Sequence, residues 1–206
     1  GMGTALKAAA AATAAAVAGA ATAIGALTTK AIEGYAAQEQ LVGGVETLFK
    51  TSSDTVVGYA NDAYKTAGMS ANEYMETVTS FSASLLASMN NDTAAAAEKA
   101  NVAITDMSDN ANKMGTDISL IQNAYNGFAK QNYTMLDNLK LGYGGTKEEM
   151  QRLLDDASKL SGIKYDISSY SDVVDAIHVV QTEMGITGTT AKEASTTIEG
   201  SVSSMS

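Results

Sequence analysis

Apolar residues recur every three or four positions along most of this chain, the spacing that places them on one face of an α-helix. The clearest runs begin near Asp54, Ser70, Asp92, Asp117 and Thr146. With the runs before and after these, the pattern predicts about eight helices. The sequence therefore predicts an all-α fold, in which short helices form a helical bundle.

Polar and glycine residues mark where these helices are expected to begin and end. A helix that reaches about Leu41 is expected to end at Gly43 and Gly44, because glycine favours helix ends. Asp54 is expected to cap the next long helix, which ends at Gly68.

The pattern becomes regular after Ser70. The box Ser70-x-x-Glu73 is typical of a helix start, because each side chain can accept a hydrogen bond from the other residue's backbone. Asp92 is expected to cap the following helix. The apolar stripe of the first of these two helices consists of Tyr74, Val78, Phe81, Leu85 and Met89.

The helix after Asp92 has heptad spacing and is expected to end at Gly115. This stripe is shorter than the three or four heptads of a coiled coil, so a bundle is favoured over a long rod. Its members are Ala97, Ala100, Ile104, Met107, Ala111 and Met114.

One further helix is expected from Asp117 to the glycine cluster Gly142–Gly145. Asn132 is the polar residue on its stripe. It is interpreted as a satisfied buried amide, as a kink near Gly127, or as a polar residue that specifies register or oligomeric state. The stripe consists of Ile118, Ile121, Tyr125, Phe128, Met135 and Leu139.

Two more capping boxes, Thr146-x-x-Glu149 and Thr190-x-x-Glu193, are expected to start helices. The apolar face after the first box consists of Met150, Leu153, Leu154, Ala157 and Leu160, and it ends at Gly162. A helix from Tyr170 is expected to end before Gly185. The core is expected to contain Ile104, Met107, Phe128, Leu139, Leu153 and Ile177.

Composition supports the helical prediction and sets the N-terminal residues apart. The 206 residues include no proline, cysteine or tryptophan, so disulfides and thiolate chemistry are excluded. Fourteen alanines lie between Ala5 and Ala26. Alanine is the best helix former, and residues 1–37 are therefore expected to form an Ala-rich apolar helical arm.

Three interpretations remain open for Ala5–Leu27. Its length is enough to span a bilayer, but alanine contributes little to insertion. A cleaved signal is also conceivable, although its apolar segment is alanine rather than leucine. We favour packing between helices, either between copies of the chain or against partner proteins, because small side chains allow helix backbones to approach closely.

Charge is concentrated in the second part of the chain. Residues 1–50 carry three basic and three acidic residues, whereas the whole chain has a net charge of -10. No helix supplies the basic stripe that a sequence-independent grip on phosphate needs. Specific binding to nucleic acid is therefore not expected.

Two motifs have some features of ligand sites but fit helical structure better. Asp106 to Asp117 has oxygen-bearing residues at the spacing of a calcium loop, but Ala111 stands where that loop needs glycine. Gly142–Gly145 precedes a helix start, as phosphate loops do, yet no strand precedes it. A helix end followed by a cap at Thr146 accounts for this cluster.

The remaining candidates for chemistry are also weak. His178 is the only histidine, so it cannot belong to a multi-histidine zinc site, and it is expected to pack beside the core. The pairs Glu148-Glu149 and Asp155-Asp156 are adjacent in sequence and point to different sides of a helix. No catalytic, cofactor-binding or metal-binding residue is assigned, and no enzyme is expected.

Several segments resemble the core region of phage tail tape measure proteins. The resemblance covers roughly Gln38 to Ser204 in collinear order. It is carried by the segments GGVETLF, TAGMSANEYMETVTSFSASLL, MSDNANKMGTDIS, IQNAYNGFAKQNYTMLDNLKLGYGGTKEEM and SGIKYDISSYSDVVDAIHVVQTEMGITGTTAKEASTTI.

The resemblance implies a structural protein of a tailed phage or prophage that sets tail length during assembly and is released with DNA ejection. It implies a location inside the tail tube of the virion, and in the host cytoplasm during assembly. The implied partners are tail tube subunits, tail assembly chaperones, tail tip proteins and other copies of the chain, with possible contact to the host membrane.

These observations divide the chain into the arm at residues 1–37, a helical core region at 38–188, and the start of a further helix at 189–206. Gly1 before Met2 is typical of a residue left by tag removal, and the chain is expected to be a fragment. The alternative function is that of a membrane-active helical protein that inserts its Ala-rich N-terminal segment.

Overall fold

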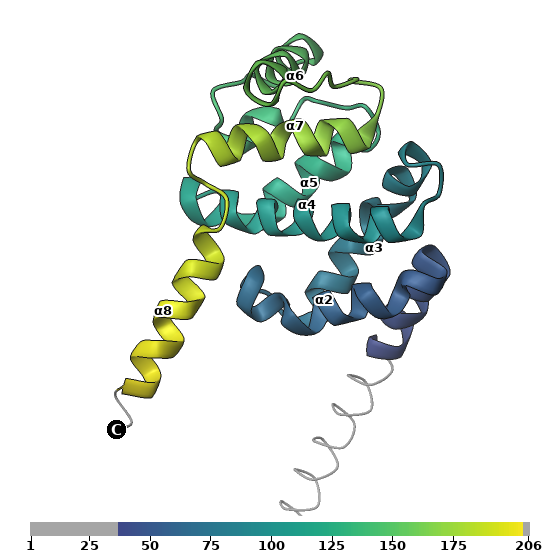
Figure 1. Ribbon diagram of the computed structural model, residues 1–206, viewed down its shortest axis with the longest axis vertical. Coiled ribbons are helices and arrows are strands. Elements are labelled where there is room, and N and C mark those ends of the chain that lie inside the picture. Colours follow the sequence, from purple (N-terminus) through teal and green to yellow (C-terminus); the bar gives the residue numbers. More distant parts are fainter. Residues whose placement is uncertain (1–36, 204–206) are drawn as a thin grey trace, which may run out of the picture. The chain divides into compact units, whose positions relative to one another are not determined.

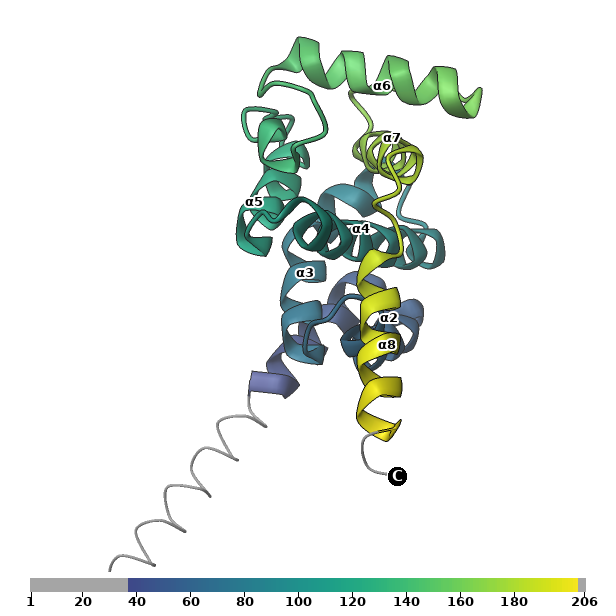
Figure 2. The same ribbon diagram turned by 90° about the vertical axis from the view of Figure 1, so that its left-hand side faces the viewer.

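The computed structural model describes residues 37–203, and within this range it contains helices and loops but no strand. The all-α prediction is therefore confirmed. The Ala-rich segment Ala5–Leu27 lies outside the described residues. Residues 41–206 belong to one compact unit, and its described part is the helical bundle shown in Figures 1 and 2.

Residues 41–49 are helical and lead into the short 3₁₀ helix η1. Gly43 and Gly44 lie within this helical stretch, so the helix end predicted there is wrong. The elements that follow are η1 (Lys50–Ser52), α2 (Ser53–Thr66), α3 (Ala71–Ser88), α4 (Thr93–Met114), α5 (Ile118–Phe128), η2 (Leu136–Leu139), α6 (Lys147–Ser161), α7 (Tyr170–Glu183) and α8 (Thr189–Ser203).

Helix α4 lies in the middle of the bundle. It contacts α2, α3, α5, α7 and α8, and both ribbon views show these helices arranged around it. Helix α6, by contrast, packs mainly on α7 and lies at the outer end of the bundle. The burial of α4 on several sides decides where the polar residues of the interior are found.

The predicted core residues are buried. Their exposed fractions are 1% or less, and the six residues are Ile104, Met107, Phe128, Leu139, Leu153 and Ile177. The stripe of α3 is buried from Tyr74 to Leu85, and only Met89 at its end is partly exposed. In α4 the first four stripe residues are buried, whereas Ala111 and Met114 pack at the edge of the core.

The predicted start of α3 is confirmed in atomic detail. The Ser70 hydroxyl accepts a hydrogen bond from the Glu73 backbone, and the Glu73 carboxylate accepts one from the Ser70 backbone at 2.8 Å. Asp92 caps α4 by accepting from the backbone of Ala94 and Ala95. Gly115 ends α4 in the left-handed conformation that glycine adopts without strain.

The single helix predicted between residues 117 and 142 is wrong. Helix α5 ends at Phe128, and a turn separates it from η2. A Cβ at Gly127 would lie 3.0 Å from the Asn132 carbonyl oxygen, so a glycine allows this close turn without a shift of the backbone. The Asn132 side chain accepts from the Thr134 backbone at 3.1 Å, as in an Asx turn.

Asn132 is exposed, so neither the buried amide nor the register-specifying residue is found there. The interpretation as a kink near Gly127 gives the right place, but the helix ends there rather than continuing through a kink. The sequence pattern is continuous because Met135, directly before η2, and Leu139, within η2, pack against the same core by a different route.

Two smaller predictions at helix ends also need correction. Asp54 lies inside the first turn of α2 rather than before it, and the preceding Ser52 bonds instead to the Thr93 hydroxyl at 3.0 Å. Leu160 at the end of α6 is 49% exposed, because this last turn extends beyond the surface that α6 buries.

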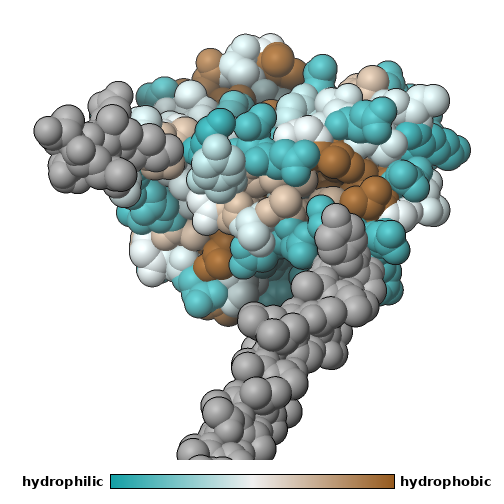
Figure 3. Space-filling model, turned by 90° about the horizontal axis from the view of Figure 1, so that it is seen from below, coloured by the Kyte–Doolittle hydropathy of each residue, from teal (hydrophilic) through white to brown (hydrophobic). Residues whose placement is uncertain are grey.

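Among the residues whose burial the structure describes, few large apolar side chains are exposed, and they belong to different elements. Figure 3 shows one face of the molecule, on which hydrophilic side chains surround small hydrophobic groups. Such scattered residues are normal on soluble surfaces and do not mark a binding site by themselves. They are Tyr64, Leu120, Leu160, Ile163 and Met184.

Helix α6 provides a matched test of the core. Leu153 is fully buried and Leu160 is half exposed on the same helix. Leu153→Ala is expected to lower the free energy of unfolding by about 2 to 5 kcal/mol, because it removes buried methyl groups and leaves a cavity. Leu160→Ala is expected to change it by less than about 1 kcal/mol. Urea unfolding measures both, and equal effects of the two substitutions would contradict the packing of α6 described above.

Candidate functional site

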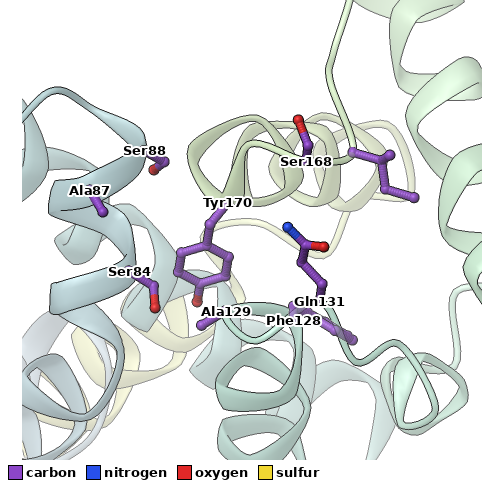
Figure 4. A pocket seen from close by; sticks show the side chains of 9 residues that line it. Ser84, Ala87, Ser88, Phe128, Ala129, Gln131, Ser168 and Tyr170 are labelled. Carbon is purple, nitrogen blue, oxygen red and sulfur yellow. The ribbon is translucent and has the colours of Figure 1, made fainter.

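A pocket of about 310 Å³ lies where the ends of α3 and α5 meet the start of α7 (Figure 4). No charged residue lines it. The lining residues are Ser84, Ala87, Ser88, Phe128, Ala129, Gln131, Ile167, Ser168 and Tyr170.

Several polar groups of this pocket already hold the helices together. The Tyr170 hydroxyl donates to the Tyr125 carbonyl oxygen at 3.2 Å, which ties α7 to α5. The Ser88 hydroxyl accepts from the Ser171 backbone at 3.1 Å, which ties α7 to α3. The Tyr170 ring also packs edge-on against Phe81. The pocket is therefore primarily a joint between three helices, without a charged group for catalysis.

The second candidate is a line of polar pairs between α4 and α7, which we call the polar seam. It consists of Lys99 with Asp175, Asp106 with His178, and Asn110 with Gln181. The partners follow the same order along both helices, so α4 and α7 run in the same direction at this contact.

The central pair of the polar seam is Asp106 with His178. The Nδ1 atom of His178 lies 2.9 Å and 3.0 Å from the two carboxylate oxygens of Asp106. Asp106 is only 1% exposed, whereas the His178 side chain is 38% exposed. An ionised carboxylate only accepts hydrogen bonds, so Nδ1 carries the proton in this contact.

Both members of this pair have altered proton affinity. Burial raises the pKa of Asp106, and the hydrogen bond from His178 opposes that shift. The hydrogen bond to Asp106 raises the pKa of His178, and burial opposes it. The remaining charges that act on the His178 pKa are Asp175 and Lys99, both from the polar seam.

The next pair, Asn110 with Gln181, is fully buried. The Asn110 amide donates to the Gln181 side chain at 2.7 Å and to the Leu139 carbonyl oxygen at 3.0 Å. It therefore connects α4 to both α7 and η2. The Tyr125 hydroxyl is also buried nearby, where burial first and the charge of Asp106 second raise the pKa of Tyr125 well above its usual value.

An Asp–His pair can orient a histidine as a general base, but this role also needs a nucleophile or a bound water within reach of the ring. Among the described residues no hydroxyl forms a hydrogen bond to the second ring nitrogen of His178. The same part of the chain contains no group of three side chains that could hold a metal ion. The Asp106–His178 pair joins α4 and α7, and the pKa values of both side chains are shifted.

The structure places the residues of the suspected calcium loop on α4. Asp106, Ser108 and Asn110 are helical, with Asp106 and Asn110 on one face and Ser108 pointing away from it, which supports the helical interpretation over a loop. Asp106 and Asn110 join the polar seam. Asp117 caps α5 through the Ser119 backbone at 2.8 Å and is exposed.

The glycine cluster before α6 is a capping structure. Thr146 accepts from the Glu149 backbone as predicted, but the Glu149 carboxylate accepts from the Gly144 backbone instead of that of Thr146. Glu149 also pairs with Arg152, and these contacts lower the pKa of Glu149 to about 2. The place where a phosphate would meet the helix start is thus taken by a carboxylate of the chain itself.

In each of the two adjacent carboxylate pairs of α6, Glu148-Glu149 and Asp155-Asp156, the second residue pairs with a basic side chain. Glu149 pairs with Arg152, which also lies 4.3 Å from the Tyr143 ring centre. Asp156 pairs with Lys159 and accepts from the Tyr143 hydroxyl at 3.1 Å. These contacts fasten the glycine cluster to α6 and do not combine two carboxylates into an acid–base pair.

The sequence pattern does not predict the polar seam, although it correctly predicts that His178 lies beside the core. One signal was present: Asp106, Asp109 and Asn110 interrupt a helix whose apolar stripe continues through Ile104 and Met107. Polar residues flanking a stripe usually face solvent, and only the burial of α4 on several sides shows that they face other helices.

Comparisons with protein-family models, curated protein sequences and solved structures give no significant match to this chain.

The pair Asp106–His178 predicts a dependence of stability on pH. The pKa of His178 is raised in the folded state, so its contribution is fully present below the unfolded pKa of about 6.5 and is lost as pH rises through the folded value. The pKa of Asp106 is also raised in the folded state, so this group likewise makes the protein less stable as pH rises, beginning at lower pH.

The variant His178→Asn tests this prediction, because its amide nitrogen can replace Nδ1 as a donor but does not titrate. Urea unfolding of both proteins from pH 6 to pH 9 is expected to show a stability advantage of the wild type that shrinks as pH rises. An advantage that stays constant or grows with pH would contradict the titration of this pair.

Proposed function

We propose that this chain is a folded module of a phage tail tape measure protein. The observation that carries the proposal is the collinear resemblance of residues 38–204 to the core region of that family. The segments that carry the resemblance fall on α3, the second part of α4 and every later element through α8, so the resemblance is not confined to one helix.

An all-α fold suits a ruler, because helix length is proportional to residue number at about 1.5 Å per residue. This bundle folds back repeatedly, however, and its longest helix, α4, has 22 residues and thus a length of about 33 Å. We therefore propose that the bundle is a compact attachment unit on the ruler, and that more extended parts of the protein measure the length.

The surface charge supports a location beside DNA without tight binding to it. The chain has a net charge of -10, and an acidic surface repels the phosphate backbone. Proposed partners are tail tube subunits, tail assembly chaperones, tail tip proteins and other copies of the chain. The proposed location is the tail tube interior, after assembly in the host cytoplasm, and the proposed role requires no enzymatic activity.

The alternative function, membrane insertion, depends on Ala5–Leu27. Among residues 37–203 no helix combines the length and hydrophobicity that a membrane crossing requires. The N-terminal segment lies outside that range. Liposome binding that is lost on removal of residues 1–30 would favour this alternative.

The proposal is tested in the phage or prophage that encodes the chain. Disruption of the gene is expected to abolish tails of uniform length. An in-frame duplication of residues 5–27 is expected to lengthen them by about 35 Å if that segment is helical, since it adds 23 residues at about 1.5 Å each. Electron microscopy of purified particles measures the lengths, and Leu160→Ala serves as a control that leaves them unchanged.

Normal tails after disruption of the gene would refute the proposed function. Mass spectrometry of the purified particles gives an independent check, because a tape measure protein is expected in assembled tails and a host membrane protein is not.

A further inference from the structure

The first turn of α8 is capped by a residue from another helix. The Thr190 box predicted from the sequence does not form, because α8 begins at Thr189 and Thr190 lies inside it. The carboxylate of Asp109 on α4 accepts from the Gly188 backbone at 2.6 Å and from the Thr190 backbone at 2.8 Å. These are backbone donors that a helix start leaves without a partner in the helix itself.

Asp109 is fully buried, and no lysine, arginine or histidine pairs with it among the described ion pairs. Its contacts are instead to the start of α8, where the helix dipole favours a negative charge. Because a buried carboxylate without hydrogen bonds is costly, Asp109 and the first turn of α8 stabilise each other.

Among the α8 side chains that the structure describes, Thr189 to Thr197, none is buried. The helix contacts α2 and α4. On α7, by comparison, eight residues are buried. Further along α8, the Glu193 carboxylate accepts a hydrogen bond from the Asn112 side chain of α4 at 3.0 Å, and this contact is exposed.

The connection between α7 and α8 has the geometry of a hinge with a fixed end. Gly185 and Gly188 both have positive φ, at 66° and 84°. Ile186 between them is 1% exposed and anchors the turn in the core. Rotation about the backbone bonds after Ile186 would move α8 without disturbing α7. Figures 1 and 2 show α8 on the outside of α2, where such a movement meets no other described helix.

We infer that α8 is a strap that docks on the bundle and leaves it as a unit, with Asp109 as its latch. When α8 leaves, the carboxylate of Asp109 becomes hydrated, so the interior is not left with an unpaired buried charge. Release also uncovers the surfaces of α2 and α4 beneath α8, and Gly68 in the turn after α2, whose Cβ position would lie 3.3 Å from the Thr190 methyl group. This inference does not depend on the proposed function.

Hydrogen exchange of the whole chain, followed by mass spectrometry, tests the strap. In the wild type the backbone amides of residues 189–197 are expected to exchange faster than those of α7, because they open without global unfolding. Asp109→Ala is expected to speed their exchange by roughly a further tenfold, through loss of the cap. Exchange in α7 is expected to stay unchanged.

Asp117→Ala is the matched control, since Asp117 caps α5 by accepting from the Ser119 backbone. It is expected to affect the start of α5 and to leave α8 unchanged. Unaltered α8 exchange in Asp109→Ala would overturn the latch. If that substitution unfolds the bundle, the exchange rates of the wild type test the strap instead. Exchange of α8 as slow as that of α7 would contradict the strap, because it would show that α8 leaves only on global unfolding.

Discussion

The burial of α4 on several sides is the constraint on which the rest of the bundle depends. This helix carries an apolar stripe and, beside it, four buried polar residues, of which Asp106, Asp109 and Asn110 form hydrogen bonds to other elements. Buried polar groups need hydrogen-bond partners, and a helix surrounded by other helices can find them only on those helices. Asp106 meets α7, Asn110 meets α7 and η2, and Asp109 meets the start of α8.

Apolar packing and polar pairing have different roles in this arrangement. The apolar stripes supply the main free energy of folding, because they remove the most nonpolar surface from water. Buried pairs add little net stability compared with well-packed apolar residues. We interpret the polar seam as a device of specificity, because each pair forms only when α7 lies at one position along α4. Helix α6 shows the contrast, since Met150, Leu153, Leu154 and Ala157 attach it through an apolar face.

What the sequence predicts correctly is local. The box Ser70–Glu73, the cap at Asp92 and the glycine ends at Gly115 and Gly162 depend on residues within one turn, and the structure contains them all. The predicted helix through Asn132 fails because Gly127 permits a close turn that periodicity does not reveal. The candidate site was not predictable, because Asp106 and His178 are 72 positions apart and the cap of α8 comes from a different helix.

The claim that polar pairs of α4 specify the docking of α7 is tested most directly by a double-mutant cycle of Asp106→Leu and His178→Leu. Unfolding in urea at pH 6 gives the free energies of the wild type, both single variants and the double variant. We expect the double variant to be more stable than the sum of the two single effects implies, with a coupling energy of about 1 kcal/mol or more. Additive effects would contradict it, since they would show that these two residues act independently of each other.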